Sequence, residues 1–187
     1  MSHDHTPAGG GTPYPLPPKD MPNPARTNEL NATRLARLTD FSRFRQKVQA
    51  VLTDLSKEFD PYIVEDPLRT PEEQAEKVAQ GFSKSLHSYH LPCPKSKDQL
   101  AAAVDIVTAA ELYKAPKLFW AKLARAYVEH GIFPGILFGL KTVERRKLLK
   151  ALKDKDWDTA IKCRFGWDPS HGELNRYRET SWSLLGV

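Results

Sequence analysis

The stretch SKSLHSYH (residues 83–90), followed by AAVDIV (residues 102–107), decides how this chain is organised. The second segment is a run of small and β-branched apolar residues, which is typical of a buried strand, and it contains one carboxylate, Asp105. A buried carboxylate has to be paired, hydrogen-bonded or bound to a metal ion. His90 comes before this strand, and imidazole and carboxylate are both good ligands for Zn²⁺. The two segments therefore predict a strand that carries part of a metal site.

A third ligand is predicted near the C-terminus, in the segment GWDPSHGE (residues 166–173). Asp168 lies three residues before His171, so one loop can present a general base and a metal ligand together. A catalytic zinc site usually has three protein ligands and one open position. We therefore expect His90, Asp105 and His171 to bind Zn²⁺, and Asp168 to take a proton from the attacking water.

Four motifs along the chain resemble those of the zinc peptidases of the D-alanyl-D-alanine carboxypeptidase and L-alanyl-D-glutamate endopeptidase family, which includes many phage endolysins. The family patterns are R-T-x-x-x-Q followed by G-x-S, then S-x-H, a small-residue A-x-D segment, and D-x-x-H or E-x-x-H. In this sequence the corresponding segments, in the same order, are RTPEEQ (69–74) with GFS (81–83), SYH (88–90), AVD (103–105) and DPSH (168–171).

The resemblance implies an α+β domain in which a small antiparallel sheet, flanked by helices, carries the zinc site. It implies an enzyme that hydrolyses a peptide bond in the stem peptide of peptidoglycan, with Arg69 orienting the substrate through its guanidinium group. Ser88 and Gln74 of the motifs are expected to bind substrate or to support the site. Glu173 is expected to be the partner of a ligand imidazole.

The acidic ligand has an alternative in Asp98. The family places its Asp about seven residues after the first His, through a Gly, whereas Asp105 follows His90 by 15 residues and PCP (92–94) replaces that turn. Asp105 is favoured because its apolar neighbours match the A-V-D-I context of the family. The neighbours of Asp98 are lysines, serine and glutamine, which are typical of a solvated segment or a helix cap. His87, three residues before His90, could meet the same metal only on a helix.

The positive balance of the chain, with 28 Lys and Arg against 23 Asp and Glu, favours an anionic partner. Bacterial wall polymers are anionic, and no nucleic-acid motif accompanies the basic residues, so the sequence does not favour a nucleic-acid binder. The alternatives to an endolysin-like endopeptidase are a D,D- or L,D-carboxypeptidase and a catalytically degraded wall-binding or virion structural module. The changed spacing between His90 and Asp105 is the feature that leaves the alternative of a catalytically degraded module open.

Neither a transmembrane segment nor a secretory signal is predicted, because no apolar run approaches the roughly 18 to 20 residues of a membrane span and the N-terminus lacks a basic start and an apolar core. We expect a monomer made in the cytoplasm that acts on the cell wall after release during phage host lysis, or as part of a virion. Cys93 and Cys163 are expected to be free thiols, because two cysteines are too few for a disulfide scaffold.

Periodicity and turn residues predict a flexible Pro/Gly-rich tail (1–28) and one peptidase domain (29–187). The domain starts with a helical segment (29–58) broken near Thr39 or Asp40, and it contains a basic helical insertion (140–162). Within it, the expected elements are a strand at 59–66, a helix at 71–80 that is capped by Thr70 and Glu73, the strand around Asp105, a helix at 116–130, a glycine-punctuated stretch at 132–139, and helices at 142–154 and 157–161.

Overall fold

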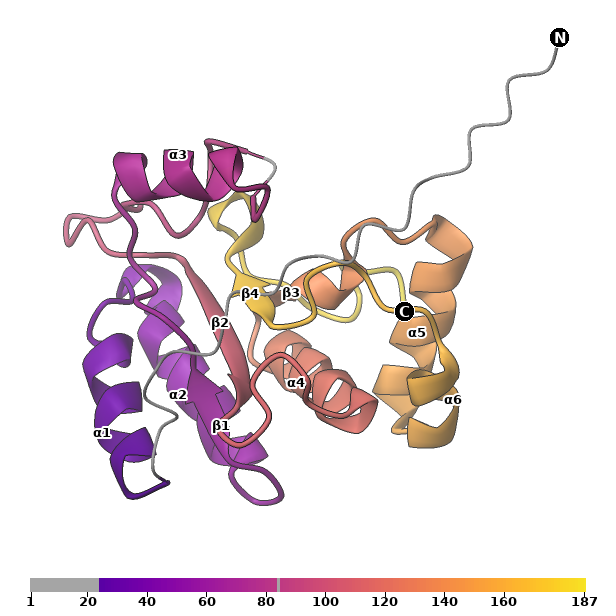
Figure 1. The fold of residues 1–187 in the computed structure, drawn as a ribbon. Helices are drawn as coiled ribbons and strands as arrows, with labels where there is room; N and C mark the ends of the chain where they lie inside the picture. The colour runs from indigo at the N-terminus through magenta and orange to yellow at the C-terminus, as the bar shows by residue number, and fades with distance from the viewer. Residues whose placement is uncertain (1–23, 84) are drawn as a thin grey trace, which may run out of the picture.

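The computed structural model describes residues 24–83 and 85–187, and within them the chain has the predicted α+β class (Figure 1). One four-stranded antiparallel sheet is accompanied by six α-helices in this part of the chain. The strands are β1 (Pro61–Ile63), β2 (Ala103–Thr108), β3 (Phe133–Pro134) and β4 (His171–Glu173). The helices are α1 (Pro24–Leu35), α2 (Phe44–Leu55), α3 (Pro71–Ala79), α4 (Lys117–Glu129), α5 (Thr142–Asp154) and α6 (Trp157–Lys162).

The sheet has the strand order β1-β2-β4-β3, so β2 and β4 are the inner strands. The predicted strand around Asp105 is confirmed as β2, and its residues are buried except for Asp105 itself, which is half-buried. Strand β4 comes from the end of the chain and pairs with β2 so that His171 lies opposite Asp105. Residues that face each other across an antiparallel pair project to the same side of the sheet. The pairing therefore brings two predicted ligands together.

Helices α1 and α2 lie along the β1 side of the sheet (Figure 1). The predicted break between them is confirmed, because α1 ends at Leu35 and α2 begins at Phe44. Helix α1 begins at Pro24, which lies inside the range predicted to be an extended tail. Proline suits the first turn of a helix, since its missing N–H has no partner there. The rest of the predicted tail, residues 1–23, lies outside the described residues.

Helix α3 begins as its sequence predicts. The Thr70 hydroxyl accepts a hydrogen bond from the Glu73 N–H, and the Glu73 carboxylate accepts one from the Thr70 N–H. This reciprocal pair satisfies two N–H groups that the helix itself leaves free. Gly81 follows the helix with φ at +78°, a conformation that favours glycine. The cap holds the residue before it, Arg69, at a defined entry to the helix.

Helix α4 joins the sheet to the C-terminal helices, and its buried stripe includes Phe119, Leu123 and Tyr127. Helices α5 and α6 lie beyond it and are predicted almost to the residue. Helix α5 turns Leu148, Leu149 and Leu152 inward and exposes its basic residues Arg146, Lys147, Lys150 and Lys153. The segment 140–162 thus contributes to the hydrophobic core with an amphipathic face.

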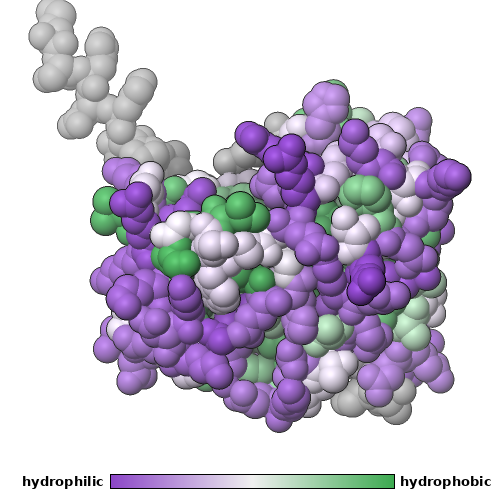
Figure 2. Space-filling view, turned by 180° about the vertical axis from the view of Figure 1, so that it is seen from behind, coloured by the Kyte–Doolittle hydropathy of each residue, from purple (hydrophilic) through white to green (hydrophobic). Residues whose placement is uncertain are grey.

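The surface is largely hydrophilic on the face shown in Figure 2, where hydrophobic side chains form small separate patches. The exposed large hydrophobic residues in the described chain are Phe82, Leu86, Val143, Trp167 and Leu184. Among residues 24–83 and 85–187, no helix is both long and apolar enough to cross a membrane. Cys93 and Cys163 are both buried and free, as predicted.

Candidate metal centre

His90, Asp105 and His171 converge on one point of the sheet and form a group that can hold a metal ion. His90 Nε2 lies 3.4 Å from His171 Nδ1 and 3.3 Å from Asp105 Oδ2. His171 Nδ1 lies 3.2 Å from Asp105 Oδ1. Only 13% of the Asp105 side chain is exposed, and the two histidines are buried. Three donor atoms that converge with so little solvent around them make a site in which a cation is electrostatically favoured.

Backbone pairing on both sides of β2 places the three residues. The antiparallel register puts Asp105 opposite His171. The segment before His90 runs along the start of β2, where the Ala102 N–H donates to the Tyr89 carbonyl at 2.8 Å. The long loop between His90 and Asp105 therefore returns to the same strand. The 15-residue spacing is compatible with convergence because the intervening residues form a loop beside β2.

Hydrogen bonds at the far side of each ring orient the two histidines. His90 Nδ1 lies 2.8 Å from the carbonyl oxygen of Pro67, and His171 Nε2 lies 3.0 Å from Glu173 Oε2. A carbonyl or carboxylate oxygen can only accept, so each of these ring nitrogens is the protonated one. The other two ring nitrogens, His90 Nε2 and His171 Nδ1, then direct a lone pair or a displaceable proton toward Asp105. Such outer partners are a general feature of histidine ligands.

Without a metal ion, a proton takes the place of the cation. Burial raises the pKa of Asp105, but the nearby His90 ring and the hydrogen bonds from both histidines outweigh it and hold that pKa well below its usual range. Burial lowers the pKa of His171, yet the hydrogen bonds to Asp105 and Glu173 raise it well above its usual range. Asp105 and His171 therefore form an ion pair in the metal-free protein, and a metal ion has to displace the proton on Nδ1.

Asp168 lies on the loop before β4, close enough to the cluster for the charges of Asp105 and His171 to act on its carboxylate. Its Oδ1 accepts a hydrogen bond from the Ser170 hydroxyl at 3.1 Å. Burial and the negative charge of Asp105 raise the pKa of Asp168 above its usual value, while the charge of His171 opposes the rise. A carboxylate with a raised pKa is a better proton acceptor than a solvated one, which suits a general base.

Two glycines allow neighbouring elements to approach this loop and strand. A Cβ at Gly135 would lie 2.4 Å from the Asp168 carbonyl oxygen, and a Cβ at Gly172 would lie 2.6 Å from the Tyr127 ring. Because Gly172 has no side chain, the Tyr127 ring of α4 lies close to it, and the Tyr127 hydroxyl donates a hydrogen bond to the Ser170 carbonyl at 2.9 Å. Helix α4 and the Gly135 turn thus fix the position of the strand that begins with His171.

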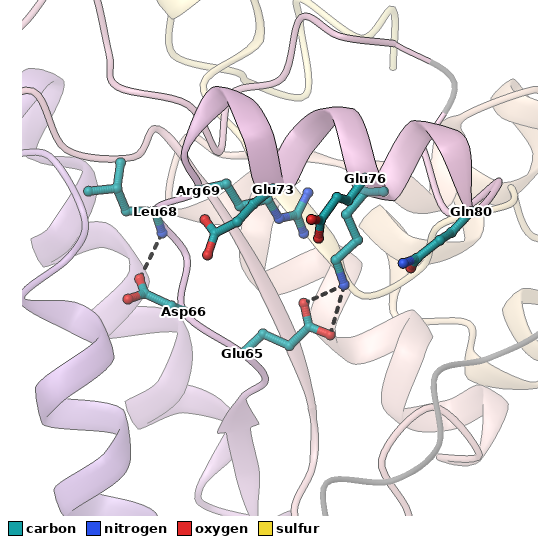
Figure 3. Close-up of a pocket in the computed structure, with 8 residues that line it drawn as sticks. Glu65, Asp66, Leu68, Arg69, Glu73, Glu76 and Gln80 are labelled. Carbon is teal, nitrogen blue, oxygen red and sulfur yellow. Dashed lines mark hydrogen bonds and ion pairs between the residues drawn. The ribbon is translucent and has the colours of Figure 1, made fainter.

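Arg69 lines a small cavity beside α3 (Figure 3). One guanidinium nitrogen is 3.5 Å from Asp105 Oδ2, and another donates to Gln74 Oε1 at 3.3 Å. Gln74 is fully buried and also donates to Ser83 and to the carbonyl of Ser85. The predicted pair of Arg69 and Gln74 is thus one hydrogen-bonded unit at the edge of the cluster.

The cavity beside α3 has a volume of about 210 Å³, and its lining contains four acidic and two basic residues. Its lining residues are Glu65, Asp66, Leu68, Arg69, Glu73, Glu76, Lys77 and Gln80. A larger hollow of about 620 Å³ lies between α2, the end of α4 and residues 179–182, and none of its lining residues belongs to the cluster. We locate the candidate site at the cluster of His90, Asp105 and His171 because its potential ligand atoms converge on one point. The volume and the lining of the two cavities do not by themselves identify a site.

Three sequence candidates lie apart from the converging donor atoms. The carboxylate of Asp98 accepts hydrogen bonds from the Thr39 hydroxyl and from the N–H groups of Asp40 and Leu100, so it fastens a loop instead. His87 is exposed and its segment is not helical. The Ser88 hydroxyl accepts from the His90 N–H at 3.2 Å, which shapes the turn that presents His90.

Tyr113 is a neighbour of the site that sequence reasoning missed. Burial raises the pKa of its hydroxyl well above its usual range, and the charges of Asp105, Glu65 and Asp168 raise it further. The hydroxyl therefore stays protonated in the field of these carboxylates. Tyr113 belongs to none of the motifs, and one tyrosine in the turn after β2 has no distinctive pattern.

No protein-family model, curated protein or solved structure matches this chain. The likeness to zinc peptidases therefore rests on the four motifs, and the function has to be argued from the geometry of the site.

Proposed function

We propose that this chain is a zinc metallopeptidase that hydrolyses a peptide bond in the stem peptide of peptidoglycan, as an endolysin-like endopeptidase. The observation that carries the proposal is the convergence of His90, Asp105 and His171, each at its motif position, with Asp168 close enough for the charge of Asp105 to raise its pKa. Three ligands and a neighbouring carboxylate are the set that zinc-dependent hydrolysis requires.

The spacing of the donor atoms supports zinc. Nitrogen and oxygen ligands lie about 2.0–2.2 Å from Zn²⁺ in tetrahedral sites, so two such ligands are about 3.3–3.6 Å from each other. The two ring nitrogens of the cluster lie 3.4 Å from each other, and each lies near one oxygen of Asp105: His171 Nδ1 is 3.2 Å from Oδ1 and His90 Nε2 is 3.3 Å from Oδ2. Two imidazoles and one carboxylate also form a ligand set that catalytic zinc sites use, with the fourth position left for water or substrate.

Each polar residue of the site has one task in this proposal. A zinc ion held by the three ligands would supply a Lewis acid that polarises the scissile carbonyl and makes water more acidic. Asp168 accepts the proton of the attacking water and returns it to the leaving amine. Arg69, held by Gln74, binds a carboxylate or carbonyl oxygen of the substrate through its guanidinium group. Glu173 keeps the His171 ring in the orientation that ligation needs.

The substrate class is supported by the order of the motifs and by the charge of the chain. The motifs resemble those of peptidases that act on peptidoglycan. The formal net charge of +5 favours the anionic polymers of a bacterial wall. The choice of an endopeptidase over a carboxypeptidase rests on the likeness to endolysins.

Zinc content and clearing of purified cell walls test the proposal together. We expect the wild type to hold about one zinc per chain and to clear the walls. Asp168→Asn should keep the zinc and lose clearing, whereas His171→Ala should lose both. Asp158→Asn, at an exposed carboxylate in the first turn of α6, is the matched control and should behave as the wild type. A protein that holds no zinc, or an Asp168→Asn variant that clears walls at the wild-type rate, would contradict the proposal.

A further inference from the structure

The three residues of the candidate metal centre are not held in the same way. Asp105 and His171 lie opposite each other in the register of β2 and β4, so the sheet fixes their separation. His90 lies in a turn between α3 and β2. Its position relative to His171 therefore depends on contacts that the pairing of the strands does not supply.

Backbone hydrogen bonds tie the His90 turn to the loop before α3 and to the start of β2. The Arg69 N–H donates to the His90 carbonyl at 2.9 Å, and the Ala102 N–H donates to the Tyr89 carbonyl at 2.8 Å. Neither bond involves β4 or the residues after it. These bonds hold His90 beside β2, but they do not tie it to the strand that carries His171.

The side chain of Tyr89, the residue before His90, reaches the chain that follows β4. Its hydroxyl accepts a hydrogen bond from the Arg176 N–H at 2.7 Å. Its ring packs edge-on against the Tyr177 ring, with the ring centroids 5.0 Å apart. Arg176 and Tyr177 belong to the 3₁₀ turn that follows β4, and we call their contact with Tyr89 the tyrosine latch. The latch joins the His90 turn to the segment that begins with His171.

The turn that takes part in the tyrosine latch has a strained backbone. Arg176 has φ at +51° and Tyr177 has φ at +54°, in the left-handed region that residues other than glycine rarely adopt. Such residues keep this conformation only where the surrounding contacts hold them. The Tyr177 N–H donates to the Leu174 carbonyl at 2.7 Å within the turn, and Tyr89 supplies contacts from outside it. The contact between Tyr89 and the turn therefore has one defined geometry.

We propose that Tyr89 is a positioning residue of the metal centre, and that the tyrosine latch holds His90 at ligand distance from His171. The latch closes a ring of contacts, because the Leu174 N–H at the end of β4 donates to the Ala102 carbonyl at 3.0 Å, and the Ala102 N–H donates to Tyr89. In a closed ring, the His90 turn cannot move away from β4 without breaking a contact. The inference rests on the metal-binding part of the proposed function and is independent of the substrate.

Metal binding by Tyr89→Phe, which removes the hydroxyl and keeps the ring, tests the tyrosine latch in the full chain. Chelator competition measures the affinity for Zn²⁺, and the visible absorption of bound Co²⁺ reports the number and geometry of the ligands. We expect the Zn²⁺ affinity to fall by about 3- to 10-fold, the range that one hydrogen bond supplies. The Co²⁺ absorption should weaken, because His90 moves away and water takes its place. Tyr62→Phe, on β1 with its ring against Arg34, is the matched control and should leave both readings unchanged.

Thermal unfolding of the metal-free variants separates positioning from general support of the fold. Wild-type Zn²⁺ affinity and an unchanged Co²⁺ spectrum in Tyr89→Phe would overturn the positioning role and leave the proposed function intact. A lower unfolding midpoint with unchanged affinity and spectrum would assign the hydroxyl to fold stability alone, which would also overturn the positioning role. A wild-type chain that binds neither metal would count against the proposed function itself.

Discussion

Removing the charge of Glu173 should weaken zinc binding without unfolding the protein. The Glu173 carboxylate lies 3.0 Å from His171 Nε2, and both residues are buried. Gln at this position keeps the shape and can still accept the hydrogen bond, but the bond loses its charge assistance, which contributes about half of its strength. Loss of such a partner typically weakens metal binding by about 10- to 100-fold, so we expect a loss of about 1.4–2.7 kcal/mol for Glu173→Gln.

The size of this loss should depend on pH in a defined direction. At low pH the metal-free His171 carries a second proton, and Glu173 stabilises that protonated ring as well as the metal-bound one. The two effects partly cancel. As pH rises through the pKa of metal-free His171, only the effect on the metal-bound state remains. The affinity difference between wild type and Glu173→Gln should therefore grow with pH.

Chelator competition at several pH values measures both expectations. Glu129→Gln is the matched control, because Glu129 pairs with Arg125 on the surface of α4 and should not affect zinc affinity. Thermal unfolding of the metal-free variants shows whether the fold is retained. Wild-type affinity in Glu173→Gln would refute the reasoning, since His171 would then need no charged partner. A loss that shrinks as pH rises would refute the account of the competing proton.

Three further predictions follow from named contacts. Asp98→Ala should lower the free energy of unfolding, measured in denaturant, by about 1–3 kcal/mol, because three hydrogen bonds are lost. The zinc content of this variant should not change, and loss of zinc would identify Asp98 as the acidic ligand. Gly166→Ala should lower the denaturation midpoint and cost about 1–3 kcal/mol, since its Cβ would overlap the Phe138 carbonyl; an unchanged midpoint would contradict the close backbone contact between Gly166 and Phe138. When a chelator keeps the protein free of metal, the Asp105–His171 ion pair should stabilise the wild type most between about pH 4 and 6.5. The depressed pKa of Asp105 gives stability that is lost as pH falls through it, and the raised pKa of His171 gives stability that is lost as pH rises through it. Asp105→Asn should flatten this profile, and an equally curved profile in the variant would rule the pair out as its cause.

The strand around Asp105 shows how far local patterns reach. Small and β-branched neighbours predicted β2, and the same neighbours favoured Asp105 over Asp98 as the residue in the cluster. The lysines and serines around Asp98 predicted a solvated segment or a cap, and its carboxylate does cap backbone N–H groups near Asp40. The burial of β2 and the capping by Asp98 could be predicted because both depend on residues within a few positions along the chain.

The tail boundary and Tyr113 show where local patterns fail. Proline-rich composition predicted an extended chain through residue 28, yet α1 begins at Pro24, because proline is compatible with the first turn and the helix packs against β1 and α2. Tyr113 enters the electrostatics of the site only because the turn after β2 folds toward Asp105 and Asp168. Neither outcome is encoded in the residues immediately around these positions.

The sequence by itself determined the helices from α2 to α6, the strand β2 and the set of residues that could be ligands. These depend on periodicity, capping and turn residues, which act over one or two helical turns. Only the tertiary structure decided that His90, Asp105 and His171 meet and that Pro67 and Glu173 orient the two histidine rings. His171 is 66 positions from Asp105 and 81 positions from His90, so its distances to both depend on the register of β4 against β2. Register is set by the packing of the whole sheet against its helices, and no short segment contains that information.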